Sequence, residues 1–248
     1  MRVLLISRCP PYPLHLGDRL IVWHLARELQ SMGYELDLLA FAQLESDWDE
    51  MDRYRHWFRE VTLIDEPRRT PLDYLQRIVW PPARFPRAAS EAWSPAMWQV
   101  IAERLAQQHY DVVHLFGSVQ VYEFAHLLAD QACLITPYES FALYLQRKID
   151  EQSRIIDRLR QFVAQHYERW MFEPYQKVVV VAQPDADTLR DLNPTLPIEV
   201  ISNGVDLDDF AAIESQRDPA TLLFIGNYAY EPNLDAALLL AQQILPEV

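Results

Sequence analysis

Short apolar runs alternate with segments of helical periodicity along most of the chain. Residues 2–7 form an apolar run that predicts a strand, and residues 18–32 carry apolar side chains at helical spacing. Gly33 directly follows this predicted helix and is expected to form its C-terminal cap. Repetition of this pattern, with mostly apolar strands, predicts an α/β fold built on a doubly wound parallel sheet of the Rossmann-like kind.

The same pattern predicts the other elements. Ser94 and Pro95 are the cap and first-turn residues expected at the start of a helix. Strands are expected at residues 34–42, 61–64, 112–116, 134–136 and 178–182, and helices at residues 48–58, 95–108, 153–172 and from Pro184 onward. Ligands bind at the carboxyl ends of the strands in such a sheet, so site residues are expected in the loops that follow the strands.

A second strand and helix unit is predicted near the carboxyl end of the chain. Residues 198–201 are a short run rich in β-branched side chains, residues 203–204 are an Asn-Gly turn signal, and residues 222–225 are a continuous apolar run of the kind buried in parallel sheets. We therefore expect a first domain at residues 1–200. Residues 201–248 are expected to form a linker and the first strand and helix of an incomplete second domain.

Two groups of residues, one near each end of the chain, form motifs. Those near the carboxyl end are Asn203, Gly204, Val205, Asp206, Phe224, Gly226, Pro232, Asn233, Asp235 and Ala236. Those near the amino end are Arg8, Pro10, Pro11, Pro13, Gly17, Asp18 and Arg19. In both places the sequence resembles the GT-B glycosyltransferases, in particular the family 4 (group 1) sugar transferases, whose domains meet at an N-G-V-D linker. In the middle, DVVHLFGS is similar to the family pattern, and Ala182 and Gln183 stand where the family carries a serine.

The resemblance implies transfer of a sugar, with retention and without a metal ion in the protein, in glycan or polysaccharide synthesis. The partners implied are a nucleoside-diphosphate sugar and a sugar or lipid-linked acceptor. The family's E-x7-E glutamates would lie beyond Val248, so we expect this chain by itself to be a truncated, inactive portion of the enzyme. Two alternatives stay open: a non-catalytic GT-B-like remnant or binding module, and a GT-B-type nucleotide-sugar epimerase.

Composition limits the classes of function. The formal net charge of −14 argues against a nucleic-acid partner, because a phosphate backbone is bound by a basic face. Cys9 and Cys133 lack metal or redox spacing and predict buried free thiols, which fits a reducing cytoplasm. No apolar run approaches the roughly 20 residues that a membrane span needs. We expect a soluble cytoplasmic protein, with peripheral contact at the inner membrane face as a further expectation.

The loop after the first strand is the first candidate site. Gly17, Asp18 and Arg19 open the following helix, so backbone N–H groups and a guanidinium are expected to face the edge of the sheet, which suits an anion. The loop has no G-x-G-x-x-G pattern, so no dinucleotide cofactor, and no other cofactor, is expected. In the family, the matching loop lies against the donor diphosphate and helps to position the acceptor. An ordinary turn at Gly17 with Asp18 as a cap is the alternative.

Other candidate residues follow later strands or belong to the second domain. Two interpretations of His114 stay open: a satisfied core histidine, and a residue that hydrogen-bonds an acceptor hydroxyl or assists proton transfer. Glu139 and Ser140 are expected to face the acceptor or to cap the next helix. The resemblance also implies an interdomain hinge at Asn203, Gly204 and Asp206 and the start of the donor side at Gly226 and Asn233.

Three D-x-D pairs match the metal motif of the other large glycosyltransferase fold. They are Asp47 with Asp49, Asp185 with Asp187, and Asp206 with Asp208. The first two pairs lie at predicted helix starts, where the helix dipole favours carboxylates. We therefore expect structural roles for them and no metal site.

Residues 67–87 are basic against the acidic background of the chain, and aromatic residues are interleaved with the arginines. The segment is interpreted either as an ordinary ion-pair surface or as a patch that contacts anionic lipid or a phosphorylated acceptor. Each cation near such a surface contributes about 1 kcal/mol. The residues expected in the patch are Arg68, Arg69, Arg84 and Arg87.

Overall fold

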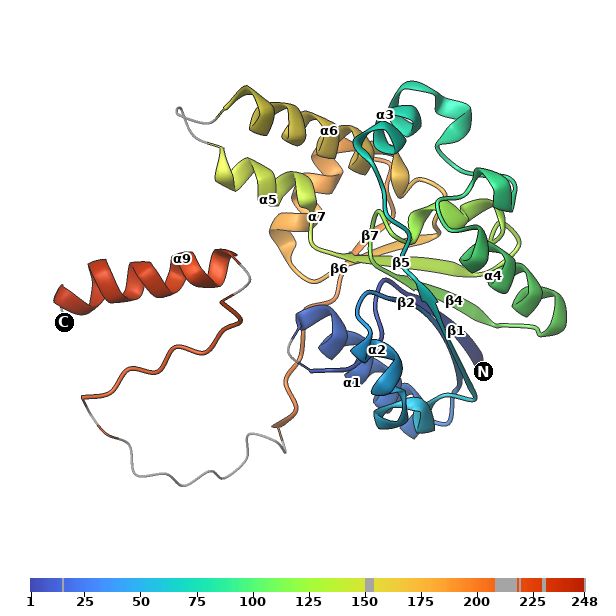
Figure 1. Cartoon of the computed structure of the whole chain (residues 1–248), viewed down its shortest axis with the longest axis horizontal. Helices are drawn as coiled ribbons and strands as arrows, with labels where there is room; N and C mark the ends of the chain where they lie inside the picture. Colours follow the sequence, from blue (N-terminus) through green and yellow to red (C-terminus); the bar gives the residue numbers. More distant parts are fainter. Residues whose placement is uncertain (15, 150–153, 208–217, 219, 229–230, 248) are drawn as a thin grey trace. The chain divides into compact units, whose positions relative to one another are not determined.

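The computed structural model of the protein describes residues 1–14, 16–149, 154–207, 218, 220–228 and 231–247. They divide into two compact units, Met1–Asn203 and Gly204–Val248. The first unit contains a sheet covered by helices, whose elements are labelled in Figure 1.

A seven-stranded parallel sheet, in the order β3-β2-β1-β4-β5-β6-β7, forms the centre of the first unit. The strands are β1 Arg2–Ser7, β2 Glu35–Ala42, β3 Glu60–Asp65, β4 Val112–Phe116, β5 Cys133–Tyr138, β6 Lys177–Val180 and β7 Ile198–Val200. The predicted doubly wound parallel sheet is confirmed. Each of these strands agrees with its predicted range to within two residues at either end.

Helices and short turns connect the strands. The helices are α1 Gly17–Ser31, α2 Ser46–Asp49, α3 Pro71–Val79, α4 Pro95–Gln107, α5 Phe141–Lys148, α6 Ile155–Met171, α7 Gln183–Leu192 and α9 Glu231–Leu239. The shorter turns are η1 Met51–Arg53, η2 Arg55–Trp57, η3 Pro81–Ala83, η4 Ala89–Glu91, η5 Tyr122–His126, η6 Leu240–Ile244 and η7 Leu245–Glu247.

Both faces of the sheet are covered by apolar side chains. Successive residues of a strand point to opposite faces, so Leu5 packs with Val22 of α1 on one face and Ile6 packs with Met97 of α4 on the other. Side chains of α6 and α7 also pack on the face that contains Ile6 and Met97. Burial on both sides explains why the strands are almost wholly apolar.

Three predicted helix boundaries are confirmed by their hydrogen bonds or backbone. Gly33 has a φ of 85° directly after α1, a left-handed conformation that glycine adopts readily. Ser94 accepts a hydrogen bond of 3.2 Å from the N–H of Met97 at the start of α4. Ser140 accepts one of 3.2 Å from the N–H of Leu143 at the start of α5, as expected for a capping residue.

In the first unit, one predicted helix was wrong and one helix was not predicted. The helix expected at residues 48–58 is instead the short α2 followed by η1 and η2. Only Tyr54 and Phe58 are buried in that segment, which is too little for a continuous apolar helix stripe. Nor was α3 predicted, although the T-x-x-D pattern of Thr70 and Asp73 is a capping-box signal and both of its hydrogen bonds are formed.

The second unit contains α9 but lacks the strand expected at residues 222–225. Leu223 and Ile225 are exposed, and no strand is assigned among the described residues of this unit. A strand requires a neighbouring strand to receive its backbone hydrogen bonds. Residues 222–225 are therefore apolar but do not form the predicted strand.

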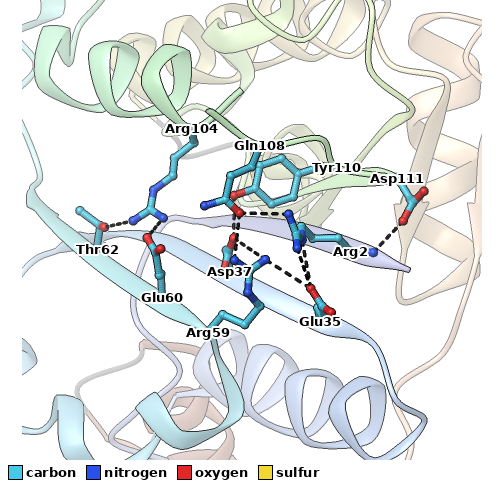
Figure 2. Close-up of polar contacts among 10 residues, drawn as sticks. All are labelled: Arg2, Glu35, Asp37, Arg59, Glu60, Thr62, Arg104, Gln108, Tyr110 and Asp111. Atoms are coloured by element: carbon cyan, nitrogen blue, oxygen red, sulfur yellow. Dashed lines mark hydrogen bonds and ion pairs between the residues drawn. The ribbon is translucent and has the colours of Figure 1, made fainter. Parts of the chain in front are cut away.

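The amino ends of the strands carry a network of ion pairs (Figure 2). Arg2 pairs with Glu35 at 2.9 Å, and the hydroxyl of Tyr110 donates to Asp37 at 2.6 Å. A depression of about 310 Å³ at this end is lined by Met51, Arg55, Phe58, Arg59, Glu60, Val61 and Arg104. The arginines that line it are paired with carboxylates: Arg55 with Asp52, Arg59 with Glu35, and Arg104 with Glu60. Ion pairs thus occupy the amino ends of β2 and β3.

Candidate functional site

The carboxyl ends of β1 and β4 are the point where the sheet changes the direction of its connections. The chain leaves β1 toward α1, which packs on one face, and leaves β4 toward η5, which packs on the other. Ligands of open parallel sheets bind in the crevice that forms at such a switch point. The loops after β1, β4 and β5 therefore define the candidate site.

Arg8 and Gly117 join the loops at this point. The N–H of Arg8 donates to the carbonyl of Phe116 at 2.9 Å, and the N–H of Gly117 donates to that of Thr136 at 2.9 Å. Gly117 has a φ of 125°, and a Cβ there would lie 3.0 Å from Cβ of Arg8. Only glycine allows this close crossing without strain. Arg8 belongs to the amino-terminal motif, but it was not among the candidate site residues.

Asp18 links the start of α1 to Arg8. Its carboxylate pairs with Nε of Arg8 at 3.1 Å and accepts a weak contact of 3.5 Å from Sγ of Cys9. Burial, followed by the Asp18 carboxylate, raises the pKa of the Cys9 thiol, so this group stays protonated. Gly17 is the first residue of α1, and a Cβ there would meet no atom within 4 Å. The backbone at Gly17 thus has room for a ligand.

Arg19 is not available to an anion in this structure. Its side chain is buried, donates to the carbonyl of Tyr12, and pairs with Asp47 at 2.7 Å. The second oxygen of Asp47 accepts the N–H groups of Gln43 and Leu44 at 2.8 and 3.1 Å. The pair fastens α1 to the loop after β2. The expectation that the guanidinium faces a ligand is replaced by this structural role.

The backbone turns sharply where β5 ends. Tyr138 has a φ of 70°, an uncommon conformation for a residue other than glycine. The N–H of Glu139 donates to the carbonyl of Pro137 at 3.0 Å, and the N–H of Ser140 donates to Asp185 at 2.8 Å. Strain of this kind is found at functional sites when the surroundings hold it in place. It presents the Glu139 side chain at the carboxyl end of the sheet.

Neighbouring groups act on the pKa of the Glu139 carboxyl in both directions. Burial and the carboxylate of Asp185 raise its pKa, and the charge of Arg8 acts in the opposite direction. Arg8, Asp18, Glu139 and Asp185 are therefore electrostatically coupled at the switch point. The sequence indicated the loops that carry them, but not the coupling.

Glu168 of α6 holds the start of α5 beneath this turn. Its buried carboxylate accepts the hydroxyl of Ser140 at 2.7 Å and the N–H groups of Phe141 and Ala142 at 2.6 and 3.1 Å. These are donors that a helix start leaves without partners in the helix itself. Tyr167 and Glu168 match a Tyr-Glu pair in the family pattern of helix, strand and helix, but the sequence assigned no role to Glu168.

Glu168 is expected to make stability depend on pH near neutrality. Burial is the largest cause that raises its pKa from 4.5 to about 7, against the opposing effect of its hydrogen bonds. The folded state binds the proton more tightly than the unfolded chain. The stabilisation is therefore fully present below pH 4.5 and is lost as the pH rises through about 7. At 1.36 kcal/mol per pKa unit, the difference is about 3 kcal/mol.

Urea unfolding between pH 4 and pH 8 measures this effect by comparing the wild type with Glu168→Gln. We expect the difference in free energy of unfolding between the two proteins to change by about 3 kcal/mol in favour of the variant as the pH rises. Parallel pH profiles for the two proteins would contradict the assignment.

His114 lies within β4 rather than at its end. Its ring stacks on Phe116 with centroids 3.9 Å apart, and Nε2 lies 2.8 Å from the hydroxyl oxygen of Thr136. Burial lowers its pKa to about 3, so the ring is neutral at pH 7. These contacts favour the satisfied core histidine over a proton-transfer role.

The D-x-D residues have local roles where the structure describes them. Asp47 and Asp185 bind backbone N–H groups as described above, and Asp187 accepts the side-chain amide of Gln183 at 2.7 Å. Asp208 lies outside the described residues. Within the described part of the chain, no group of three or more His, Cys, Asp or Glu side chains is suited to hold a metal ion.

The arginines of residues 67–87 divide into two groups. Arg69 pairs with Glu66 at 2.8 Å and lies over the ring of Trp93, and Arg84 lies over the ring of Trp170. Arg68 and Arg87 are exposed. The two stacked guanidinium groups stabilise the fold through aromatic contacts, which leaves a smaller basic surface than the sequence suggests.

The hinge and donor-side residues fall at the end of the first unit and in the second. Asn203 is the last residue of the first unit, and Gly204 and Asp206 open the second. Gly226 and Asn233 lie together, because a Cβ at Gly226 would be 3.1 Å from the Asn233 amide. That amide also donates to the carbonyl of Asn227 at 3.1 Å, which links the first turn of α9 to Asn227.

Comparison with known proteins gives a family and a fold. A family described as Glycosyltransferase Family 4 matches residues 20–209, and no curated protein sequence matches the chain. The structure is similar to sucrose-phosphate synthase from Thermosynechococcus elongatus, with 14% identity and a TM-score of 0.50 over 84% of this chain and 49% of that one. It is also similar to UGT2 of Phytolacca americana, complexed with UDP-2fluoro-glucose and pterostilbene, with 11% identity and a TM-score of 0.48 over 85% of this chain and 56% of that one. The chain therefore spans about half the length of these two structures.

Proposed function

Because the chain belongs to glycosyltransferase family 4 and has the GT-B type of fold, we propose that it serves the transfer of a sugar from a nucleoside-diphosphate donor to an acceptor hydroxyl. The family match over residues 20–209 carries the proposal. Its finer parts are retention at the sugar carbon, a sugar or lipid-linked acceptor, and a cytoplasmic role in glycan or polysaccharide synthesis. Each of these finer parts is supported by the sequence resemblance.

The loop cluster at the switch point is proposed to bind the acceptor. Glu139 would accept a hydrogen bond from the acceptor hydroxyl and orient it. The backbone at Gly17 would lie against the donor diphosphate, where the start of α1 favours negative charge. Arg8 and Asp18 would hold the two loops in register through their ion pair. These roles require that the loop residues be held in fixed positions, and the strained turn at Tyr138 holds Glu139 in place.

The second unit is proposed to begin the donor side. Asn203, Gly204 and Asp206 would form the hinge between the domains. Gly226 and Asn233 would form the turn that leads into the first helix of the nucleotide-sugar domain, and their close contact supports this role. The domain boundary near residue 200 belongs to the same proposal.

The test measures release of nucleoside diphosphate from uridine, guanosine and adenosine diphosphate sugars, in the presence of acceptor hydroxyl compounds. In a form of the protein that carries a complete nucleotide-sugar domain, we expect one donor to support transfer and Glu139→Gln to lower kcat/KM by about 10- to 100-fold, since a hydrogen bond to a charged group contributes about 1.5–3 kcal/mol. The 248-residue chain alone is expected to be inactive. Asp187→Asn is the matched control, because Asp187 is exposed on the neighbouring α7. Calorimetry with the same donors measures binding separately.

The outcomes separate the alternatives. Equal rates for Glu139→Gln and Asp187→Asn would remove Glu139 from the acceptor site. Conversion of a donor sugar to its epimer without transfer would favour the epimerase. Neither binding nor release with any donor, for this chain and for any longer form of the protein, would favour the non-catalytic binding module and overturn the proposal.

A further inference from the structure

Helix α3 has an inner face that fixes its orientation on the first unit. Arg77 is buried and pairs with Glu123 at 3.2 Å. The ring of Tyr74 makes edge contacts with Trp93 and Tyr167, with centroids 5.4 and 5.7 Å apart. The capping box at Thr70 fixes the first turn. The helix cannot rotate about its axis without breaking these contacts, so its outer face is a constant feature of the surface.

The outer face of α3 is apolar and exposed. Leu72 is 62% exposed, Leu75 53% and Val79 66%, and Trp80 directly after the helix is 65% exposed. Spacings of three and four residues place Leu72, Leu75 and Val79 in one stripe along the helix, and Trp80 follows the helix directly. Single exposed apolar residues are ordinary, but four of them on and next to one short helix indicate a binding surface. We call these four residues the α3 stripe.

Positive charge accompanies the α3 stripe. Arg68 lies three residues before the start of the helix and is exposed, as is Arg87 further along. The one acid inside the helix, Asp73, is engaged by the N–H and hydroxyl of Thr70. This local charge contrasts with the net charge of −14 for the whole chain. A partner that binds the α3 stripe and these arginines would therefore present both an apolar surface and negative charge.

We infer that the α3 stripe lies in the interface of an anionic lipid bilayer, with Leu72, Leu75 and Val79 among the acyl chains and Trp80 at the level of the headgroups. Tryptophan and arginine are the side chains that suit this boundary. A stable protein partner needs about 800 Å² on each side, more than four side chains provide, whereas a lipid interface has no such minimum. Among the described helices none is long and apolar enough to cross a bilayer. The helix would lie in the plane of the membrane.

Co-sedimentation with vesicles tests this inference without donor or acceptor, so its failure is distinct from failure of the transfer proposal. Vesicles of phosphatidylcholine alone are compared with vesicles that also contain phosphatidylglycerol. We expect binding only to the anionic vesicles and a loss of about tenfold or more for Leu75→Glu and for Val79→Glu. Met32→Glu is the matched control, because Met32 is exposed at the end of α1 and the change in charge is the same.

A second measurement reports on Trp80 itself. Anionic vesicles that carry brominated acyl chains should quench part of the tryptophan fluorescence, and Trp80→Phe should remove that part. Circular dichroism verifies that each variant is folded. Equal binding to the two kinds of vesicle, or equal loss for Leu75→Glu and Met32→Glu, would overturn the inference. Sedimentation velocity tests whether a second copy of the chain binds the stripe instead. If the protein forms a dimer that Leu75→Glu abolishes, while vesicle binding stays unchanged, the stripe is a dimer interface and the inference is overturned.

Discussion

Glu123→Ala is expected to lower the free energy of unfolding by about 3–5 kcal/mol, because it leaves the buried guanidinium of Arg77 without its carboxylate. Glu123 is itself fully buried and also accepts the N–H groups of Trp93 and Ser94 at 2.9 and 3.4 Å. The variant removes all three contacts at once. Burial raises the pKa of Glu123, which the backbone donors and Arg77 oppose. Burial of Glu123 and Arg77 is therefore favourable only while both groups keep their partners.

Urea unfolding measures this loss, and the exposed pair Arg55 with Asp52 provides the control. That pair has a similar separation of 3.3 Å, but both side chains are largely exposed. Asp52→Ala should change the free energy of unfolding by less than about 1 kcal/mol, as exposed pairs do. If Glu123→Ala were no more harmful than Asp52→Ala, the buried pair would not be an anchor of α3.

Asp47→Ala is expected to cost a similar amount, about 3–5 kcal/mol, since it leaves Arg19 charged and buried without a partner carboxylate. It also removes the acceptor for the N–H groups of Gln43 and Leu44. In the double variant with Arg19→Met, the buried charge is gone as well. We therefore expect the double variant to be more stable than the sum of the single effects predicts.

Asp49→Ala distinguishes this structural role of Asp47 from a metal-binding role of the Asp47 and Asp49 pair. Asp49 is exposed, so its removal should leave the free energy of unfolding within about 0.5 kcal/mol of the wild type. A metal site would instead require both carboxylates, and a divalent cation would then stabilise the wild type more than either variant. That result would contradict the structural assignment.

The sequence was sufficient for the sheet because the central strands, such as β1 and β2, are buried on both faces and consist of recognisable apolar runs. It was less informative for residues 48–58 and 71–79, where helix formation depends on which few side chains reach the core. Arg77 illustrates the difficulty. A charged residue in a basic segment indicates surface, yet its partner Glu123 lies 46 residues further along the chain.

The candidate site was predictable as a set of loops but not as a set of contacts. The switch point follows from the order of the strands, and Gly17, Asp18 and Glu139 were identified because they follow strands. The burial of Arg19 depends on Asp47, 28 residues away, and the role of Glu168 depends on Ser140, also 28 residues away. Such pairings are set by the fold, so local patterns carry no sign of them.

The position of β1 in the middle of the sheet has a consequence for synthesis of the protein. β1 is the first strand to leave the ribosome, and it pairs early with β2, which follows after a single helix. The other edge of β1 stays unpaired until β4 is synthesised, because Val3 pairs with Val112, more than 100 residues later in the chain. Until then a strand with four consecutive apolar residues presents unpaired backbone groups, which favours association with other nascent chains. Folding of this domain is therefore expected to benefit from a chaperone that shields the β1 edge during that interval.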